Sequence, residues 1–142
     1  MRAVSVAEKQ QSLVELFGGI PDPQEKLSAI VEWSKRIPRL PASARTQEHR
    51  VPGCDSPVWV SLQPLPNSTF RVQADAESPV VRALVCALAH VYDEAEANDI
   101  VNTEPTLLDE LGLAATLSFT RRNGLLAVRQ RIRESVRATT GS

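Results

Sequence analysis

One cysteine near the middle of the chain has the neighbours best suited to covalent chemistry. Cys54 follows Gly53 in the run Glu48-His-Arg-Val-Pro-Gly-Cys-Asp-Ser-Pro-Val-Trp59 and leads into a strand-like alternation. This arrangement predicts a thiol on a loop tip ahead of a rigid element. A thiol attacks as its thiolate, and an ordinary pKa of about 8.5 leaves only a minor fraction ionised at neutral pH. The nearby cation of Arg50, and His49 beside it, are therefore candidates for favouring the thiolate.

The residues beside the cysteine leave two interpretations open. Gly53 has no side chain to block a large reagent, and its backbone reaches conformations closed to other residues. Asp55 acts in the opposite direction, because a neighbouring carboxylate raises a thiol pKa and slows attack. Spacing alone fits a nucleophile and a small buried residue at the start of a strand equally well.

Composition indicates a single domain spanning residues 1–142. The 142 residues are 42% hydrophobic, which suffices for one core of ordinary size. Lys and Arg number 16 against 17 Asp and Glu, so the formal net charge of -1 gives no general attraction to polyanions. We therefore expect no nucleic acid among the partners.

The sequence predicts a cytoplasmic protein that does not bind membranes. Its apolar stretches are interrupted by Arg82, His90 or proline and fall short of a bilayer span. No apolar run typical of a signal peptide stands at residues 1–6. Cys54 and Cys86 lie far apart in dissimilar contexts, which favours free thiols over a structural disulfide.

Helical periodicity precedes the cysteine, and strand periodicity follows it. Residues 6–17 and 23–37 predict two helices, and residues 39–48 predict an irregular connection. Alternation over residues 58–63 and 70–75 predicts a β-hairpin, to which an extended piece at 49–51 would add a third strand.

The helical period returns after the hairpin and continues to the end of the chain. Helices are predicted over residues 79–92, 95–101, 105–111 and 124–138. The order of helices, strands and helices predicts an α+β fold. It would consist of a small antiparallel sheet of about three strands packed with the N- and C-terminal helices.

An ordered series of motif residues extends this interpretation. It comprises Val51, Gly53, Cys54, Ser56, Val58, Trp59, Leu111-Gly112-Leu113, Leu117-Ser118, Arg121 and Asn123-Gly124-Leu125. The series resembles the SufE family of sulfur acceptor proteins, which includes the CsdE proteins, and the match runs from about Phe17 to Val136. The resemblance implies the fold that this family shares with IscU.

The resemblance also implies sulfur transfer in iron-sulfur cluster assembly. In that family a pyridoxal-phosphate cysteine desulfurase, of the SufS or CsdA type, holds sulfur as a persulfide, and the motif cysteine attacks its terminal sulfur. Cys54 would then be the catalytic residue, would become a persulfide, and would pass sulfur to a downstream scaffold. Such a chain stimulates the desulfurase and acts with it rather than as an autonomous enzyme. It needs no metal or cofactor of its own.

The same comparison assigns secondary roles around the cysteine. Gly53, Ser56, His49 and Arg50 would shape the loop, His49 chiefly by hydrogen bonding. Arg121 matches the arginine of the family's Ser-Arg-x-x-Gly-Leu segment, although Thr120 stands in the serine position. It would dock the desulfurase or organise the loop, unless it is only a solvated arginine in a first helical turn.

Structural roles are the favoured expectation for Asp75, Glu77 and Cys86. Asp75 and Glu77 fall in the acidic turn before the helix at 79–92, where they would gate the loop or, as we favour, cap that helix through its dipole. Cys86 has no counterpart in the motif, and helical spacing favours a small buried filler over a second reactive thiol.

Three other functions compete with the sulfur acceptor. An IscU-type cluster scaffold needs several converging ligands, whereas one motif cysteine stands without neighbours. A cysteine hydrolase using Cys54 with His90 or His49 needs a base oriented by a third group, and no such partner order is recognisable. A non-catalytic adaptor that regulates a desulfurase would leave Cys54 incidental.

Overall fold

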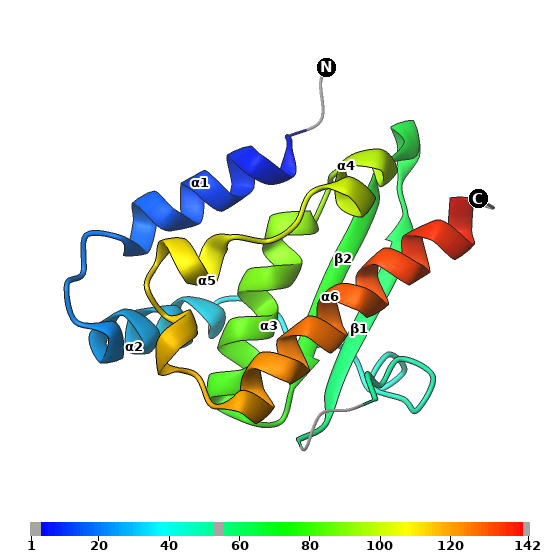
Figure 1. Cartoon of the computed structure of the whole chain (residues 1–142). Coiled ribbons are helices and arrows are strands. Elements are labelled where there is room, and N and C mark those ends of the chain that lie inside the picture. Colours follow the sequence, from blue (N-terminus) through cyan, green and yellow to red (C-terminus); the bar gives the residue numbers. More distant parts are fainter. Residues whose placement is uncertain (1–3, 53–55, 141–142) are drawn as a thin grey trace.

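A two-stranded antiparallel sheet forms one side of the protein in a computed structural model that describes residues 4–52 and 56–140 (Figure 1). Strand β1 (Val58–Pro64) pairs with β2 (Phe70–Ala76) in a register that joins Val58 to Ala76. The predicted hairpin is confirmed. The third strand is not: within the described residues, the segment at 49–51 contributes a bridge between Arg50 and Trp59 instead of a full strand.

The two N-terminal helices begin where the sequence places their caps. Helix α1 (Val6–Phe17) starts with a reciprocal capping box between Ser5 and Glu8. Helix α2 (Pro23–Ser34) starts at Asp22, whose carboxylate accepts a hydrogen bond from the Gln24 amide. α2 ends before the predicted residue 37, since residues 35–37 form tight turns ahead of Pro38.

Helix α3 (Pro79–Tyr92) is the centre of the core. It packs against β2, α2, α1 and the final helix, so ten of its 14 residues are buried. Because other elements cover α3 on several sides, its sequence is apolar around most of its circumference instead of along one stripe.

The remaining helices form the side of the molecule that Figure 1 shows in yellow to red. Short helices α4 (Ala97–Asn102) and α5 (Leu107–Glu110) lead to α6 (Phe119–Thr140), which runs along β1 and packs on α4 and α3. α6 starts five residues before the predicted residue 124. Its inward seam consists of Val128, Ile132 and Val136, which are fully buried.

The α+β architecture predicted from the sequence is therefore confirmed. The hairpin, α3 and α6 share one hydrophobic core. Helices α1 and α2 also pack on α3 and add residues to this core. Within the described part of the chain, no helix combines the length and apolarity needed to cross a membrane.

Candidate functional site

The residues on either side of the cysteine loop are joined by backbone hydrogen bonds. The Val51 amide donates to the Val58 carbonyl over 2.8 Å, and the Val60 amide donates to the His49 carbonyl over 2.9 Å. These bonds close the base of a loop spanning residues 52–57. Cys54 and Gly53, together with Asp55, lie outside the described residues, so the expectations for Cys54 and Gly53 remain predictions.

Two other elements hold this loop base from outside. The Glu77 amide, in the turn before α3, donates to the Pro57 carbonyl over 3.2 Å. From α6, Arg131 donates to the carbonyl oxygens of Arg50, over 3.2 Å, and Glu48. The chain on both sides of the cysteine is thus fixed to neighbouring elements.

His49 makes a hydrogen bond within its own turn, as a loop residue would. Its Nδ1 lies 2.9 Å from the Thr46 hydroxyl, within the turn that leads into the loop base. The ring is therefore engaged in a local hydrogen bond.

A cavity of about 240 Å³ opens beside the downstream end of the loop. It lies where the beginnings of β1, α3 and α6 meet. It is lined by Ser56, Val58, Ser78, Val81, Leu84, Val85, Ser118, Thr120, Arg121, Gly124 and Leu125. The fold thus brings Ser56 and Arg121 to one cavity, although they are far apart in sequence.

Arg121 stands in the first turn of α6 and is exposed to solvent. The Ser118 hydroxyl accepts a hydrogen bond from the Arg121 amide over 3.2 Å, as an N-terminal cap does. Within residues 4–52 and 56–140, the guanidinium has no acidic partner. A cation at a helix N-terminus opposes the helix dipole, so helix stability does not account for this arginine.

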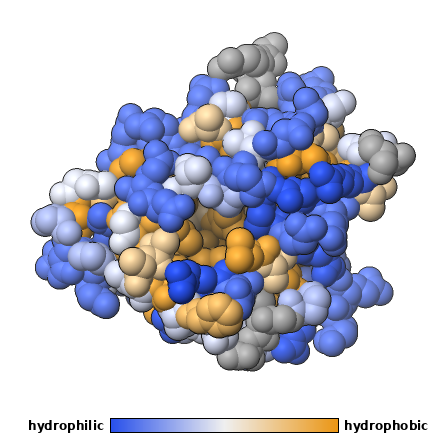
Figure 2. All heavy atoms as spheres, viewed as in Figure 1, coloured by the Kyte–Doolittle hydropathy of each residue, from blue (hydrophilic) through white to orange (hydrophobic). Residues whose placement is uncertain are grey.

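A second, apolar hollow of about 210 Å³ adjoins the first and shares Leu84 and Leu125 with it. It lies between α3, α5 and α6. Figure 2 shows apolar residues gathered around a depression in the middle of this face, which is otherwise largely polar. Phe119 and Leu126, in the first turns of α6, are also exposed.

Asp75 is a framework residue instead of a docking residue, because its side chain is fully buried. Its carboxylate accepts hydrogen bonds from Arg39, from Arg82 and from the amides of Leu40 and Ala76. Burial alone would raise the carboxyl pKa, but these hydrogen bonds outweigh burial and hold the pKa below its ordinary value. The favoured expectation that Asp75 caps α3 is wrong, because Ser78 is the N-cap of that helix. Gating of the cysteine loop by Asp75 stays a prediction.

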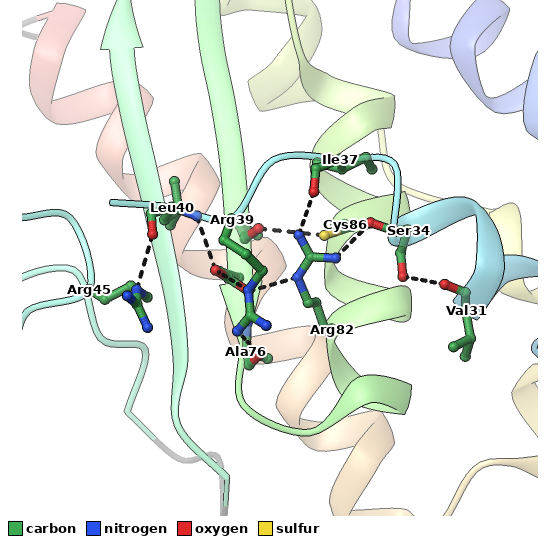
Figure 3. A network of polar contacts seen from close by, with 11 residues as sticks. Val31, Ser34, Ile37, Arg39, Leu40, Arg45, Ala76, Arg82 and Cys86 are labelled. Atoms are coloured by element: carbon green, nitrogen blue, oxygen red, sulfur yellow. Dashed lines mark hydrogen bonds and ion pairs between the residues drawn. The ribbon is translucent and has the colours of Figure 1, made fainter. Parts of the chain in front are cut away.

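The buried Arg82 connects this carboxylate to the chain after α2. Figure 3 shows its guanidinium reaching toward the carbonyl oxygens of Ser34 and Ile37, which accept hydrogen bonds over 2.6 and 2.8 Å. The same side chain donates to Asp75, so β2, α3 and residues 34–40 form one polar network.

Ser78 caps α3 in place of the two acidic residues. Its hydroxyl accepts a hydrogen bond from the Val81 amide over 3.5 Å. Glu77 is exposed, and its backbone amide, not its carboxylate, makes the contact with the cysteine loop at Pro57.

Cys86 is the small buried residue that helical spacing predicted. It is 3% exposed, and its thiol donates to the Ala74 carbonyl over 3.5 Å. Burial raises the pKa of the Cys86 thiol to about 11, so little thiolate forms there at neutral pH.

Comparison with known proteins identifies the family. The family model for SufE, described as an Fe-S metabolism associated domain, matches residues 11–136. The chain belongs to the SufE family. This confirms the resemblance that the motif residues carried.

Two similar proteins match this chain over most of its length and most of their own. The sulfur acceptor protein CsdE of Escherichia coli K12 is 28% identical over 123 residues, 86% of this chain and 84% of CsdE. An uncharacterised SufE-like protein of Rhizobium etli is 29% identical, covering 88% of this chain and 87% of its own length. The chloroplastic quinolinate synthase of Arabidopsis thaliana is 29% identical over 76% of this chain, which matches only 15% of that enzyme's length.

The SufE fold also appears in a solved structure. The solution structure of a hypothetical protein from Thermus thermophilus superposes with a TM-score of 0.75, covering 94% of this chain and 97% of the other. Sequence identity is 21%, so the likeness concerns the fold alone.

The contact of Arg131 with the base of the cysteine loop was not predicted from the sequence. The position of Arg131 three residues after the buried Val128 and one before the buried Ile132 is the signal that places it at the edge of the packed face.

Proposed function

We propose that this chain accepts sulfur on Cys54 from the persulfide of a pyridoxal-phosphate-dependent cysteine desulfurase and passes it on for iron-sulfur cluster assembly. Membership of the SufE family over residues 11–136 supports this function. So does the similarity to CsdE, a sulfur acceptor protein, over 84% of its length. The pyridoxal phosphate belongs to the partner, which we expect to be of the SufS or CsdA type.

The observation that carries the proposal is the state of the other cysteine. The chain has two cysteines, and Cys86 is buried with its thiol pKa raised to about 11. At 3% exposure, the Cys86 thiol offers little access to a persulfide held on another protein. Cys54 is the candidate that remains.

The proposed step is thiol exchange without any external oxidant. The Cys54 thiolate attacks the outer sulfur of the partner's cysteine persulfide, and a new sulfur-sulfur bond forms on Cys54. The partner's own sulfur-sulfur bond breaks, and its cysteine leaves as a thiolate. A reducing cytoplasm suits this exchange, because both thiols stay free there.

Two features beside the loop support the same reaction. The cavity next to Ser56 is walled by Val58, Val81 and Val85, and an apolar wall excludes the water through which reductants approach. At the rim of this cavity, Arg121 offers an exposed guanidinium with no acidic partner among residues 4–52 and 56–140, which suits a carboxylate of the desulfurase.

The test is incubation with a SufS-type desulfurase, its cofactor and cysteine, followed by intact mass measurement and peptide mapping. Wild type and Cys86→Ser should each gain a sulfur atom on the peptide containing Cys54, and Cys54→Ser should gain none. Binding and stimulation that survive in Cys54→Ser, without sulfur on wild type, would favour the adaptor. Iron and acid-labile sulfide on the purified protein would favour the scaffold.

A further inference from the structure

Arg131 contacts the chain just before the cysteine loop from a separate element. Nη1 donates to the carbonyl oxygen of Arg50 over 3.2 Å, and Nη2 donates to that of Glu48. These acceptors belong to residues only four and six positions before Cys54 in the sequence. A guanidinium holding two carbonyl oxygens fixes direction as well as distance, because its donors lie in one rigid plane.

The contact is additional to the bonds that form the loop base. Those bonds use the amides of Val51 and Val60 and the carbonyl oxygens of Val58 and His49. Arg131 takes two other carbonyl oxygens, so it ties the same segment to α6 instead of to β1. Without it, the backbone pairing would still form, but the segment would lose both of these hydrogen bonds to α6.

The fold of α6 does not depend on this arginine. The helix is held to the core by its seam of Val128, Ile132 and Val136, which are fully buried. Arg131 itself is only half-buried, and its donors point to loop carbonyls instead of to another helix. Its hydrogen bonds therefore order residues 48–50 more than they stabilise the helix.

We propose that Arg131 is a positioning residue for sulfur transfer, which fixes the upstream base of the Cys54 loop to α6. The inference rests on the proposed function. Attack on a persulfide requires the thiolate to approach the outer sulfur along the sulfur-sulfur axis. A loop base with one fixed position increases the fraction of docked complexes that reach this alignment.

The test compares Arg131→Ala and Arg131→Lys with Arg137→Ala, which removes an exposed arginine from the last turn of the same helix. With a SufS-type desulfurase and cysteine, Arg131→Ala should lower the rate of persulfide formation on Cys54 at saturating partner about fivefold. The half-saturating partner concentration should stay unchanged, since docking groups are intact. Arg131→Lys should be intermediate, because an ammonium group keeps the charge but not the paired donors.

A second measurement does not depend on the desulfurase. The rate constant for alkylation of Cys54 by iodoacetamide, followed by peptide mapping, should rise about threefold in Arg131→Ala, because an untethered base samples more conformations. Urea unfolding of each variant shows whether the protein is folded during the assays. Wild-type values in both assays for Arg131→Ala would overturn the inference, as would a rate loss equal to the loss of folded protein.

The outcomes separate this inference from the proposed function. If wild type gains no sulfur, the proposed function fails, and the alkylation rates still decide whether Arg131 restrains the loop. If wild type and Arg137→Ala gain sulfur at the same rate as Arg131→Ala, the proposed function stands and the positioning role is wrong.

Discussion

Arg82 and Asp75 form an ion pair inside the protein, with Nε 2.8 Å from Oδ1 and side chains 7% and 0% exposed. The pair joins α3 to the end of β2, immediately before the turn that contacts the cysteine loop at Pro57. The orientation of that turn therefore depends on a buried charge pair.

Arg82→Met should destabilise the protein by about 3–5 kcal/mol, because it leaves the buried Asp75 carboxylate with one cation fewer. Arg39→Met is the matched control. Arg39 also contacts Asp75, but its side chain is 54% exposed and water replaces it more easily. The comparison requires urea unfolding at neutral pH, and equal losses in the two variants would contradict this account.

Acid should weaken the fold through Asp75. The pKa of the Asp75 carboxyl is held below its ordinary value of about 3.9. The charged carboxylate therefore stabilises the folded protein fully at pH values above about 3.9. This contribution disappears as the pH falls through the lowered pKa of the folded state. Urea midpoints measured from pH 6 downwards should fall steeply for wild type. The fall should be shallower for Asp75→Asn, whereas Asp109→Asn, at an exposed position, should follow wild type.

Alkali should weaken the fold through Cys86. Burial raises the thiol pKa to about 11, so the folded protein keeps a proton that the unfolded chain releases from about pH 8.5 upwards. The free energy of unfolding is therefore unaffected by this thiol at pH values below its pKa in the unfolded chain. It declines as the pH rises from that value to the pKa in the folded protein. Cys86→Ala should show a smaller alkaline decrease in urea midpoint than wild type does; identical profiles would argue against the raised pKa.

Arg121→Gln should weaken association with the desulfurase several-fold without loss of stability. Removing a cation from the first turn of α6 relieves an unfavourable dipole interaction of a few tenths of a kcal/mol. The association constant should also depend less on salt than in wild type. Arg137→Gln, at the opposite end of α6, serves as the control, and calorimetry at two salt concentrations makes the measurement. Unchanged affinity in Arg121→Gln would exclude Arg121 from docking.

Ile132→Ala should cost about 2–5 kcal/mol, because it opens a cavity in the fully buried seam of α6. Leu126→Ala, on the same helix but 66% exposed, should change stability by no more than about 0.5 kcal/mol. Thermal or urea unfolding compares them. A large loss for Leu126→Ala would mean that this leucine is covered in solution.

Local signals in the sequence accounted for most element boundaries. The starts of α1 at residue 6 and of α3 at residue 79 were predicted correctly, because the signals that begin a helix act within about three residues. The cap of α3 was not, since Ser78 holds that place instead of Asp75 or Glu77. The start of α6 was missed because Asn123 and Gly124 are typical of turns, whereas Ser118 provides the cap. The extra strand failed because pairing at 49–51 stops at one bridge.

The site was less predictable, since its contacts join distant segments. Asp75 was assigned to α3 because the helix follows it closely, but its carboxylate also binds Arg39, 36 residues away. Arg131 reaches Arg50 across 81 residues, and no local pattern encodes that meeting. By contrast, the family motif linked Ser56 and Arg121 to one region, and the fold brings both to the same cavity.

Helix α6 carries both Arg121, at the rim of the cavity, and Arg131, at the base of the cysteine loop. Ten residues of continuous helix separate them, about 15 Å along the axis. A force applied by a docking partner at the first turn would therefore be transmitted along a stiff rod to the carbonyl oxygens before Cys54. Under the proposed function, partner recognition and presentation of the thiol would thus be mechanically coupled through one helix.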